Sequence, residues 1–220
     1  MLDSYILFSF FYGSKSLIIF IIIKKEYKRI PFLNTLYSFI FMSINSKESK
    51  KIAVVDSSFW ININRVGLVD SLLERFELVF TSKVEEELLI NSKLFYTPKD
   101  IIIYNRLKEI GLIEIKDPKI ISPDLWNILS KDSGEIYTIA LAIELNATVL
   151  VDNSAAIEYC IQKNILITNS VTFILYDALQ SKLTYTQALD KINLLKPYIR
   201  ERYILIGLNT LDKIKGDING

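Results

Sequence analysis

Four acidic residues lie where the chain passes from one expected element to the next. Asp56 and Asp152 directly follow short, apolar, β-branched runs that are typical of buried strands. Glu87 and Glu135 lie near the starts of helical stretches. Ligand sets made only of oxygen favour Mg²⁺ or Mn²⁺, and such ions activate water and stabilise the leaving oxygen in phosphodiester cleavage. The chemistry that these residue types predict is metal-dependent hydrolysis.

Each of these acids also has a structural explanation. Asp56 and Asp152 precede helices and suit the N-cap position, and Glu135 suits the positive end of a helix dipole. Asp132 is expected chiefly as an N-cap. Four carboxylates that converged at one sheet edge would repel and raise one another's pKa values, and a divalent cation removes that repulsion. The joint pattern favours a cation site over four separate caps.

Composition narrows the chemistry further. The chain has no histidine, and Cys160 is its single cysteine. This excludes a Ser-His-Asp triad, Cys-His catalysis, His-ligated zinc and Cys-rich zinc modules. Residues 1–50 carry 7 Lys and Arg against 3 Asp and Glu, so the remainder carries 26 − 7 = 19 against 25 − 3 = 22, a net charge of −3. A mildly acidic body argues against a general nucleic-acid coat but allows an enzyme that reaches phosphate through metal.

The elements that must position these acids alternate along the chain from Lys51. Strands alternating with helices predict an α/β domain with a central, mainly parallel sheet flanked by helices in three layers. In such sheets, ligands bind beyond the carboxyl ends of the strands, where Asp56 and Asp152 emerge. The expected strands are residues 52–55, 78–81, 112–115, 148–151 and 165–168, with 203–207 as an edge strand. The expected helices are residues 57–76 with a break at Gly67, then 83–94, 99–110, 122–129, 133–145, 154–163, 170–181 and 184–195.

The first 49 residues differ from the rest. Apolar runs there are interrupted by Lys15 and by the basic stretch 24–29. One interpretation is a membrane anchor or uncleaved signal, although a Lys near the centre of a span costs roughly 2.5–3.5 kcal/mol. The other is that the natural product begins at or near Met42. We therefore expect an extension at 1–49, a domain at 50–207, a tail at 208–220 and a cytoplasmic protein.

Each of the four acids lies in a short motif. The motifs are Val-Val-Asp56-Ser-Ser, Val84-Glu-Glu-Glu87-Leu, Asp132-Ser-Gly-Glu135 and Val149-Leu-Val-Asp152. They occur in the order found in PIN domains, and on them the sequence resembles the PIN-domain family. The stretch 134–167 is most similar to an archaeal and bacterial PIN-like subgroup related to VapC-type toxins. The resemblance covers residues 51 to about 207.

This resemblance implies a central parallel sheet, Mg²⁺-dependent ribonuclease activity, frequent homodimers and a small antitoxin partner. It maps the catalytic, metal-binding acids onto Asp56, Glu87, Glu135 and Asp152. Ser57 or Ser58 matches the small polar residue that supports the first acid, and Asp132 is a further supporting residue. The chain departs from the pattern at Asn153, because many members have a second acid there. That loss of charge is expected to lower metal affinity.

Two functions from different classes follow. The first is a Mg²⁺- or Mn²⁺-dependent endoribonuclease, expected to be the toxin of a toxin–antitoxin pair. The alternative is a non-catalytic PIN-like module that binds nucleic acid or a protein, and a third hypothesis anchors an acidic docking domain to a membrane through residues 1–49. Trp60 and Trp126 are expected in the core or an interface. The candidate phosphate contacts are Arg65, Lys83, Lys131, Lys196, Arg200 and Arg202.

Overall fold

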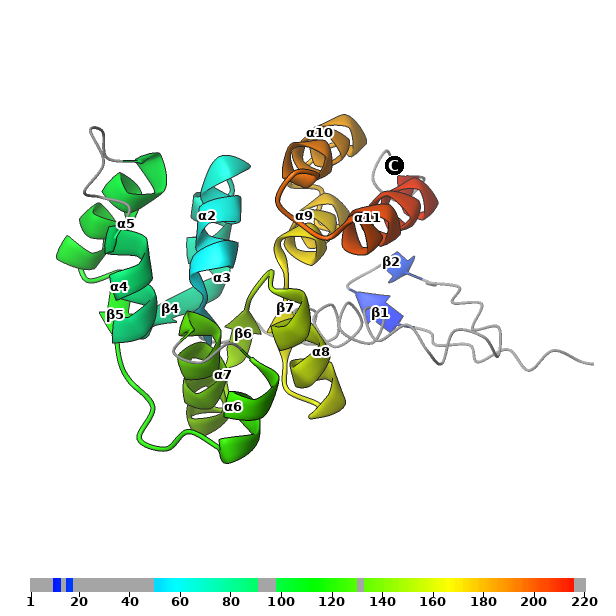
Figure 1. Cartoon of the computed structure of the whole chain (residues 1–220). Coiled ribbons are helices and arrows are strands. Elements are labelled where there is room, and N and C mark those ends of the chain that lie inside the picture. Colours follow the sequence, from blue (N-terminus) through cyan, green and yellow to red (C-terminus); the bar gives the residue numbers. More distant parts are fainter. Residues whose placement is uncertain (1–9, 13–14, 18–49, 91–97, 130–132, 216–220) are drawn as a thin grey trace, which may run out of the picture. The chain divides into compact units, whose positions relative to one another are not determined.

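The computed structural model describes residues 10–12, 15–17, 50–90, 98–129 and 133–215 (Figure 1). The chain separates into two compact units, Met1–Lys47 and Glu48–Gly220. In the first unit, the described residues form a short antiparallel pair of strands, β1 (Phe10–Tyr12) and β2 (Lys15–Leu17). The four acids all belong to the second unit, whose architecture decides whether they meet.

A five-stranded sheet forms the centre of the second unit. Its order is β5-β4-β3-β6-β7, and every neighbouring pair is parallel. The first strand of this sheet in sequence, β3, lies in its middle. The next two strands, β4 and β5, extend the sheet to one edge, and β6 and β7 then extend it on the other side of β3. The strand order therefore reverses between β3 and β6. This confirms the α/β prediction with a parallel sheet. The strands are β3 (Lys51–Val55), β4 (Phe76–Phe80), β5 (Ile113–Ile115), β6 (Thr148–Leu150) and β7 (Ile167–Thr168).

Helices connect and flank these strands, as parallel pairing requires. α7 packs against β3 and β6, α3 against β4 and α8 against β7, while α9, α10 and α11 pack on one another as a group (Figure 1). The helices are α2 (Ser57–Arg65), α3 (Val69–Arg75), α4 (Ser82–Ile90), α5 (Lys99–Glu109), α6 (Pro123–Ile128), α7 (Gly134–Leu145), α8 (Ser154–Gln162), α9 (Ser170–Leu179), α10 (Tyr185–Leu195) and α11 (Glu201–Lys213).

The core explains why the strands are apolar without alternation. Ala53, Val54 and Val55 in the central strand are fully buried, as expected where helices cover both faces of a parallel sheet. Beside them, Trp60 packs edge-to-face on Phe80 at a centroid distance of 5.5 Å. Its indole nitrogen donates a hydrogen bond to the Asp100 carbonyl. The prediction that Trp60 belongs to the core is therefore confirmed.

The edge strand expected at 203–207 is wrong. Those residues lie inside α11, whose buried side chains recur at helical spacing at Tyr203, Ile204, Gly207 and Leu211. Gly207 brings α11 close to α9, because a β-carbon there would clash with the Val171 side chain. A short apolar run does not distinguish a strand from one buried stripe of a helix, and here the packing of α11 on α9 favours the helix.

Some sequence predictions fall outside the described residues. Asp132 and Lys131 are among them, and Ser133 occupies the N-cap position of α7. Of residues 1–49, only β1 and β2 are described, so the choice between an anchor and a start at Met42 stays a prediction. Within the part of the chain that is described, no helix combines the length and the apolar character needed to cross a membrane.

Candidate functional site

Asp56 and Asp152 emerge side by side at the carboxyl edge of the sheet. Asp56 follows β3, and Asp152 lies two residues beyond the end of β6, its parallel neighbour. The backbone N–H of Asp56 donates to the Leu150 carbonyl at 2.9 Å, and that of Asp152 donates to Ser58 Oγ at 3.2 Å. Both side chains are buried, Asp56 almost completely. The reversal of strand order thus places the two carboxyl groups at the switch point of the sheet.

Asp56 serves both as a helix cap and as a buried acid. Its Oδ2 accepts hydrogen bonds from the Ser58 backbone N–H at 2.9 Å and from Ser58 Oγ, which confirms the N-cap explanation. Its Oδ1 is buried and has no donor among the described residues. Burial, followed by the charge of Glu135 and more weakly that of Glu87, raises the pKa of Asp56 to about 7 against the hydrogen bonds from Ser58.

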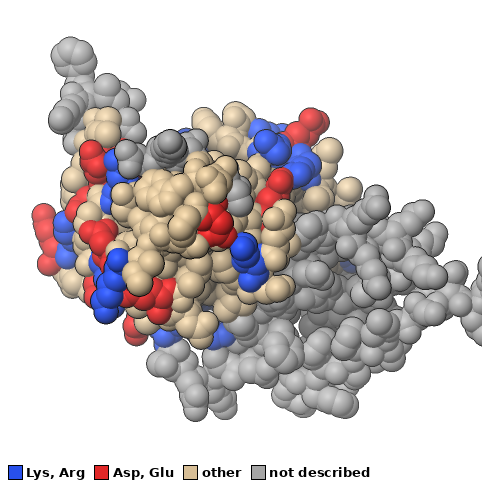
Figure 2. Space-filling model, turned by 60° about the horizontal axis from the view of Figure 1, so that its bottom comes forward, with Lys and Arg blue, Asp and Glu red and all other residues tan. Residues whose placement is uncertain are grey.

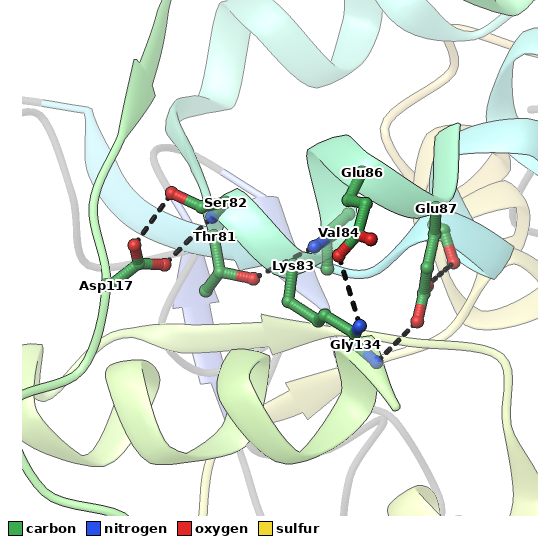
Figure 3. A network of polar contacts seen from close by, with 9 residues as sticks. Thr81, Ser82, Lys83, Val84, Glu86, Glu87, Asp117 and Gly134 are labelled. Carbon is green, nitrogen blue, oxygen red and sulfur yellow. Dashed lines mark hydrogen bonds and ion pairs between the residues drawn. The ribbon is translucent and has the colours of Figure 1, made fainter. Parts of the chain in front are cut away.

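Glu87 is held between two elements that are distant in sequence. Its Oε2 accepts from Ser57 Oγ at 2.9 Å, and its Oε1 accepts from the Gly134 backbone N–H at 2.6 Å (Figure 3). A β-carbon on Gly134 would lie 2.7 Å from Glu87 Oε2, so this position has room for hydrogen alone. The contact anchors the start of α7 against α4. It places Glu135, the next residue, close enough to raise the pKa of Asp56.

The start of α4 is held separately. Asp117 accepts hydrogen bonds from the Ser82 backbone N–H at 2.8 Å and from Ser82 Oγ at 2.7 Å (Figure 3). Ser82 is the first residue of α4, so these contacts satisfy a backbone donor that the helix itself leaves free. Asp117 therefore caps the N-terminus of α4, the helix that carries Glu87.

Asp152 is more fully hydrogen-bonded than Asp56. Its Oδ1 accepts from the Ser170 backbone N–H at 2.8 Å. Its Oδ2 accepts from Ser170 Oγ at 2.6 Å and from Asn62 Nδ2 at 2.8 Å. Burial raises the pKa of Asp152, and the bonds from Ser170 and Asn62 oppose that rise. The N-cap explanation for Asp152 is wrong, because Asn153 caps α8 by accepting from Ala155 and Ala156.

The acids therefore form a linked set. Asp56 interacts electrostatically with Glu135 and Glu87, and Ser58 connects Asp56 Oδ2 to the Asp152 backbone. As they stand, however, no three acidic side chains of the described residues lie close enough together to hold one metal ion. Asn153, expected as a supporting residue, uses its side-chain oxygen for the α8 cap. The donor chemistry suits a hard divalent cation, because a buried carboxyl among like charges lacks a positive partner.

Four of the six candidate phosphate contacts have protein partners among the described residues. The guanidinium of Arg65 lies 3.5 Å from the centre of the Tyr198 ring, and its Nη1 donates to Asn62 Oδ1. Lys83 pairs with Glu86 on the same helix, at 3.1 Å between Nζ and Oε2. Among these cations, Arg65 alone is tied by the described contacts to a residue that bonds one of the four acids, Asp152.

The remaining basic candidates lie towards the carboxyl end. Arg202 bonds Glu158 directly and also donates to the Tyr203 hydroxyl at 2.7 Å, while Arg200 Nη1 lies 4.0 Å from Glu158 Oε1. Lys196 is exposed at the end of α10. On the face shown in Figure 2, acidic and basic side chains are interspersed with other residues. That face is not a continuous basic surface, in keeping with the net negative charge of this part of the chain.

Three residues that hold the acids were missed from sequence. Gly134 is part of the Asp132-Ser-Gly-Glu135 motif, but its role depends on a contact with Glu87, 47 positions earlier. Ser170 follows the last strand at the same sheet edge, so its position was a usable signal. Asn62 is a buried polar residue on the otherwise apolar face of α2 that includes Phe59 and Ile63. A buried amide needs partners, and this was the available indication.

One comparison with known proteins identifies a relationship. A family model described as DUF3368, PIN domain, matches residues 52–204, well over half of the chain. The matched span runs from β3 into α11 and includes Asp56, Glu87, Glu135 and Asp152. No curated protein matches the chain.

Proposed function

Since the chain belongs to the PIN-domain family DUF3368, we propose that it is a metal-dependent endoribonuclease that cleaves RNA phosphodiester bonds. PIN domains are typically nucleases and usually bind Mg²⁺. The residues assigned to hold Mg²⁺ or Mn²⁺ are Asp56, Glu87, Glu135 and Asp152. All four belong to the span that the family model covers.

The observation that carries this proposal is the charge environment of Asp56. Its carboxyl is buried beside Glu135 and Glu87, and none of the described Lys or Arg side chains forms an ion pair with it. An ionised buried carboxylate without a positive partner is costly. A bound divalent cation would supply that partner and remove the repulsion between the acids. The site is thus destabilised when empty and ionised, as expected of a ligand site.

The residues of the chain divide the work between binding and orientation. Ser58 orients Asp56, and Ser57 with the Gly134 N–H orients Glu87. Glu135 adds a further negative charge beside them. A divalent cation held by these residues would supply the chemistry of water activation and leaving-group stabilisation in phosphodiester cleavage. The hydrogen bonds to Asp56 and Glu87 restrain both carboxylates, and the four acids would have to draw closer together to share one ion.

The family and the motif resemblance support more specific parts of the proposal. RNA is the expected substrate, and a small antitoxin protein and a second copy of the chain are the expected partners. The cytoplasm is the expected location. Arg65 is the favoured contact to the RNA backbone because it bonds Asn62, which in turn bonds Asp152.

A non-catalytic PIN-like module that binds nucleic acid or a protein is the second candidate function. Two observations favour it. No three acids of the described residues stand close enough to share one ion, and Asn153 replaces an acid found in many members while its oxygen caps α8. In this case the acidic edge would serve as a docking surface without cleavage.

The test compares purified wild-type protein with two variants on a mixed pool of single-stranded RNA. Wild type is expected to cleave with Mg²⁺ or Mn²⁺ and to stop when EDTA is added. Asp56→Asn is expected to lose cleavage because a neutral group replaces an anionic ligand. Glu86→Gln is the matched control, since Glu86 neighbours Glu87 on α4 but is exposed and pairs with Lys83.

The outcomes separate the two functions. Equal cleavage by wild type and Asp56→Asn would mean contamination or a site elsewhere. No cleavage by wild type over a range of RNAs and metals, together with retained RNA or protein binding, would favour the non-catalytic module. Loss of activity in Glu86→Gln equal to that in Asp56→Asn would remove the assignment of the site to the buried acids.

A further inference from the structure

Asn62 lies between an acid of the proposed site and an exposed cation. It is buried on α2, and its Nδ2 donates to Asp152 Oδ2 at 2.8 Å. Its Oδ1 accepts from Arg65 Nη1 at 2.5 Å. The amide nitrogen therefore bonds an anionic partner, and the amide oxygen bonds a cationic one.

These partners leave the amide one orientation. A guanidinium has only donors, and an ionised carboxylate has only acceptors. The amide oxygen must then face Arg65 and the amide nitrogen must face Asp152, and a flip would place donor against donor and acceptor against acceptor. Arg65 and Asp152 thus require the same orientation of the Asn62 amide, and Arg65 holds the end that faces away from the acid.

Arg65 is itself restrained. Its guanidinium lies 3.5 Å from the centre of the Tyr198 ring, a cation–π geometry. Arg65 and Asn62 are three positions apart on α2, so their side chains project from one side of the helix. The contacts run in series from Tyr198 through Arg65 and Asn62 to Asp152, and Asp56 caps the start of the same helix.

We propose that Asn62 is a positioning residue that fixes the carboxylate of Asp152 for a divalent cation, and that Arg65 acts through Asn62 by fixing its amide. This rests on the proposed cation site. Three donors occupy Asp152, two of them on Oδ2, which leaves Oδ1 with the greater capacity to accept a further ligand. The donors on Oδ2 set the direction in which Oδ1 points. Residues that orient metal ligands in this way affect metal affinity by about 10–100-fold.

The experiment measures Mn²⁺ binding alone, without RNA, by the loss of the free Mn²⁺ signal in electron paramagnetic resonance titrations. Asn62→Leu, which keeps the size of the side chain and removes both hydrogen bonds, is expected to weaken affinity by about 10-fold. Asn64→Leu is the matched control. Asn64 is also a buried asparagine of α2, but its Nδ2 bonds the Trp60 carbonyl. It should lower the melting temperature comparably and leave Mn²⁺ affinity unchanged.

The role of Arg65 is tested in the same titration. Arg65→Met lies at an exposed position and should fold normally, and it is expected to weaken Mn²⁺ affinity by about threefold. Because Arg65 acts through Asn62, the double variant should bind Mn²⁺ as Asn62→Leu does, with no further loss. If Asn62→Leu does not fold, Arg65→Met decides alone.

The results that would overturn the inference are distinct from those that would overturn the cation site. Asn62 would not be a positioning residue if Asn62→Leu bound Mn²⁺ with wild-type affinity, or if Asn62→Leu and Asn64→Leu lost affinity equally. If Asn62→Leu does not fold, wild-type affinity in Arg65→Met would lead to the same conclusion. Additive losses in the double variant would remove the action of Arg65 through Asn62. Failure of wild type to bind Mn²⁺, or equal binding by Asp56→Asn, would remove the site itself and this inference with it.

Discussion

Two buried aspartates in this domain have neighbours of opposite charge. Asp177, on α9, is fully buried, accepts from Ser71 Oγ at 2.9 Å and forms an ion pair with Arg75. Asp56, at the end of β3, is equally inaccessible but faces the like charges of Glu135 and Glu87. Each carboxylate leaves one oxygen without a donor among the described residues, so hydrogen bonding does not separate them.

The difference lies in charge. The fold supplies Asp177 with its own cation, and the guanidinium of Arg75 is further covered by the rings of Tyr176 and Phe173 at 4.2 and 4.9 Å. Asp56 receives carboxylates instead, which raise its pKa. Burial of an acid is therefore a weak indication of function by itself. A buried acid surrounded by other acids is a stronger one, because something outside the chain must compensate the charge.

The Arg75–Asp177 pair should be structural, and breaking it should have the largest effect. Arg75→Met leaves a buried carboxylate without its partner and is expected to lower the free energy of unfolding by about 3–5 kcal/mol. Urea denaturation followed by circular dichroism measures this. The double variant Arg75→Met with Asp177→Leu should recover much of the loss, and RNA cleavage per folded molecule should not change. A loss below about 1 kcal/mol in Arg75→Met would contradict this role.

Asp56 should show the opposite behaviour. Asp56→Asn is expected to reduce metal-dependent RNA cleavage by at least about 100-fold, equivalent to roughly 3 kcal/mol of barrier, because it removes a ligand charge. Single-turnover cleavage rates measure this. Asp177→Asn is the matched control, since it is the same substitution at an equally buried position and should change stability but not the rate per folded molecule. Similar rate losses in both variants would abolish the distinction between the two acids.

The pH dependence of stability gives an independent test. The folded-state pKa of Asp56 is raised to about 7 from its ordinary value of 3.8. Between these values the folded protein binds a proton that the unfolded chain does not, so stability falls as pH rises and the loss is complete above about pH 7. Between about pH 6 and pH 8 the metal-free protein should lose about 1 kcal/mol.

The part of this loss that is due to Asp56 should disappear in Asp56→Asn, and saturating Mg²⁺ should reverse the loss in wild type, since the cation competes with the proton and binds more tightly as pH rises. Thermal melts at several pH values, with EDTA or Mg²⁺, measure both effects. Asp152, whose pKa is also raised by burial, contributes in the same direction. A metal-free protein whose stability increased over this pH range would contradict the assignment.

Asn153→Asp should have the smallest effect. Asp caps a helix about as well as Asn, so the cap on α8 is preserved and stability should change by less than about 0.5 kcal/mol. The added charge beside Asp152 is expected to tighten Mn²⁺ binding by a few-fold. Titration with Mn²⁺ checks this. Weaker binding would indicate that a further acid raises the pKa values of its neighbours more than it attracts the ion.

The sequence by itself determined the order of elements and the location of the acids. Alternating apolar runs and helical patterns predicted the parallel α/β sheet, because the strand–helix alternation is a property of contiguous residues. Asp56 and Asp152 were found because each ends a strand, and parallel neighbours bring such ends to one edge. These are local signals combined with one general rule of topology. The match to the PIN family over residues 52–204 agrees with them.

Tertiary structure decided which side chains hold which acids. Ser57 supports Glu87 from 30 positions away, Asn62 supports Asp152 from 90, and Ser71 reaches Asp177 from 106. It also made residues 203–207 part of a helix, because α11 packs closely on α9 through Gly207. Hydrogen bonds between buried side chains depend on how whole helices settle against the sheet. Short patterns in the sequence do not contain that arrangement.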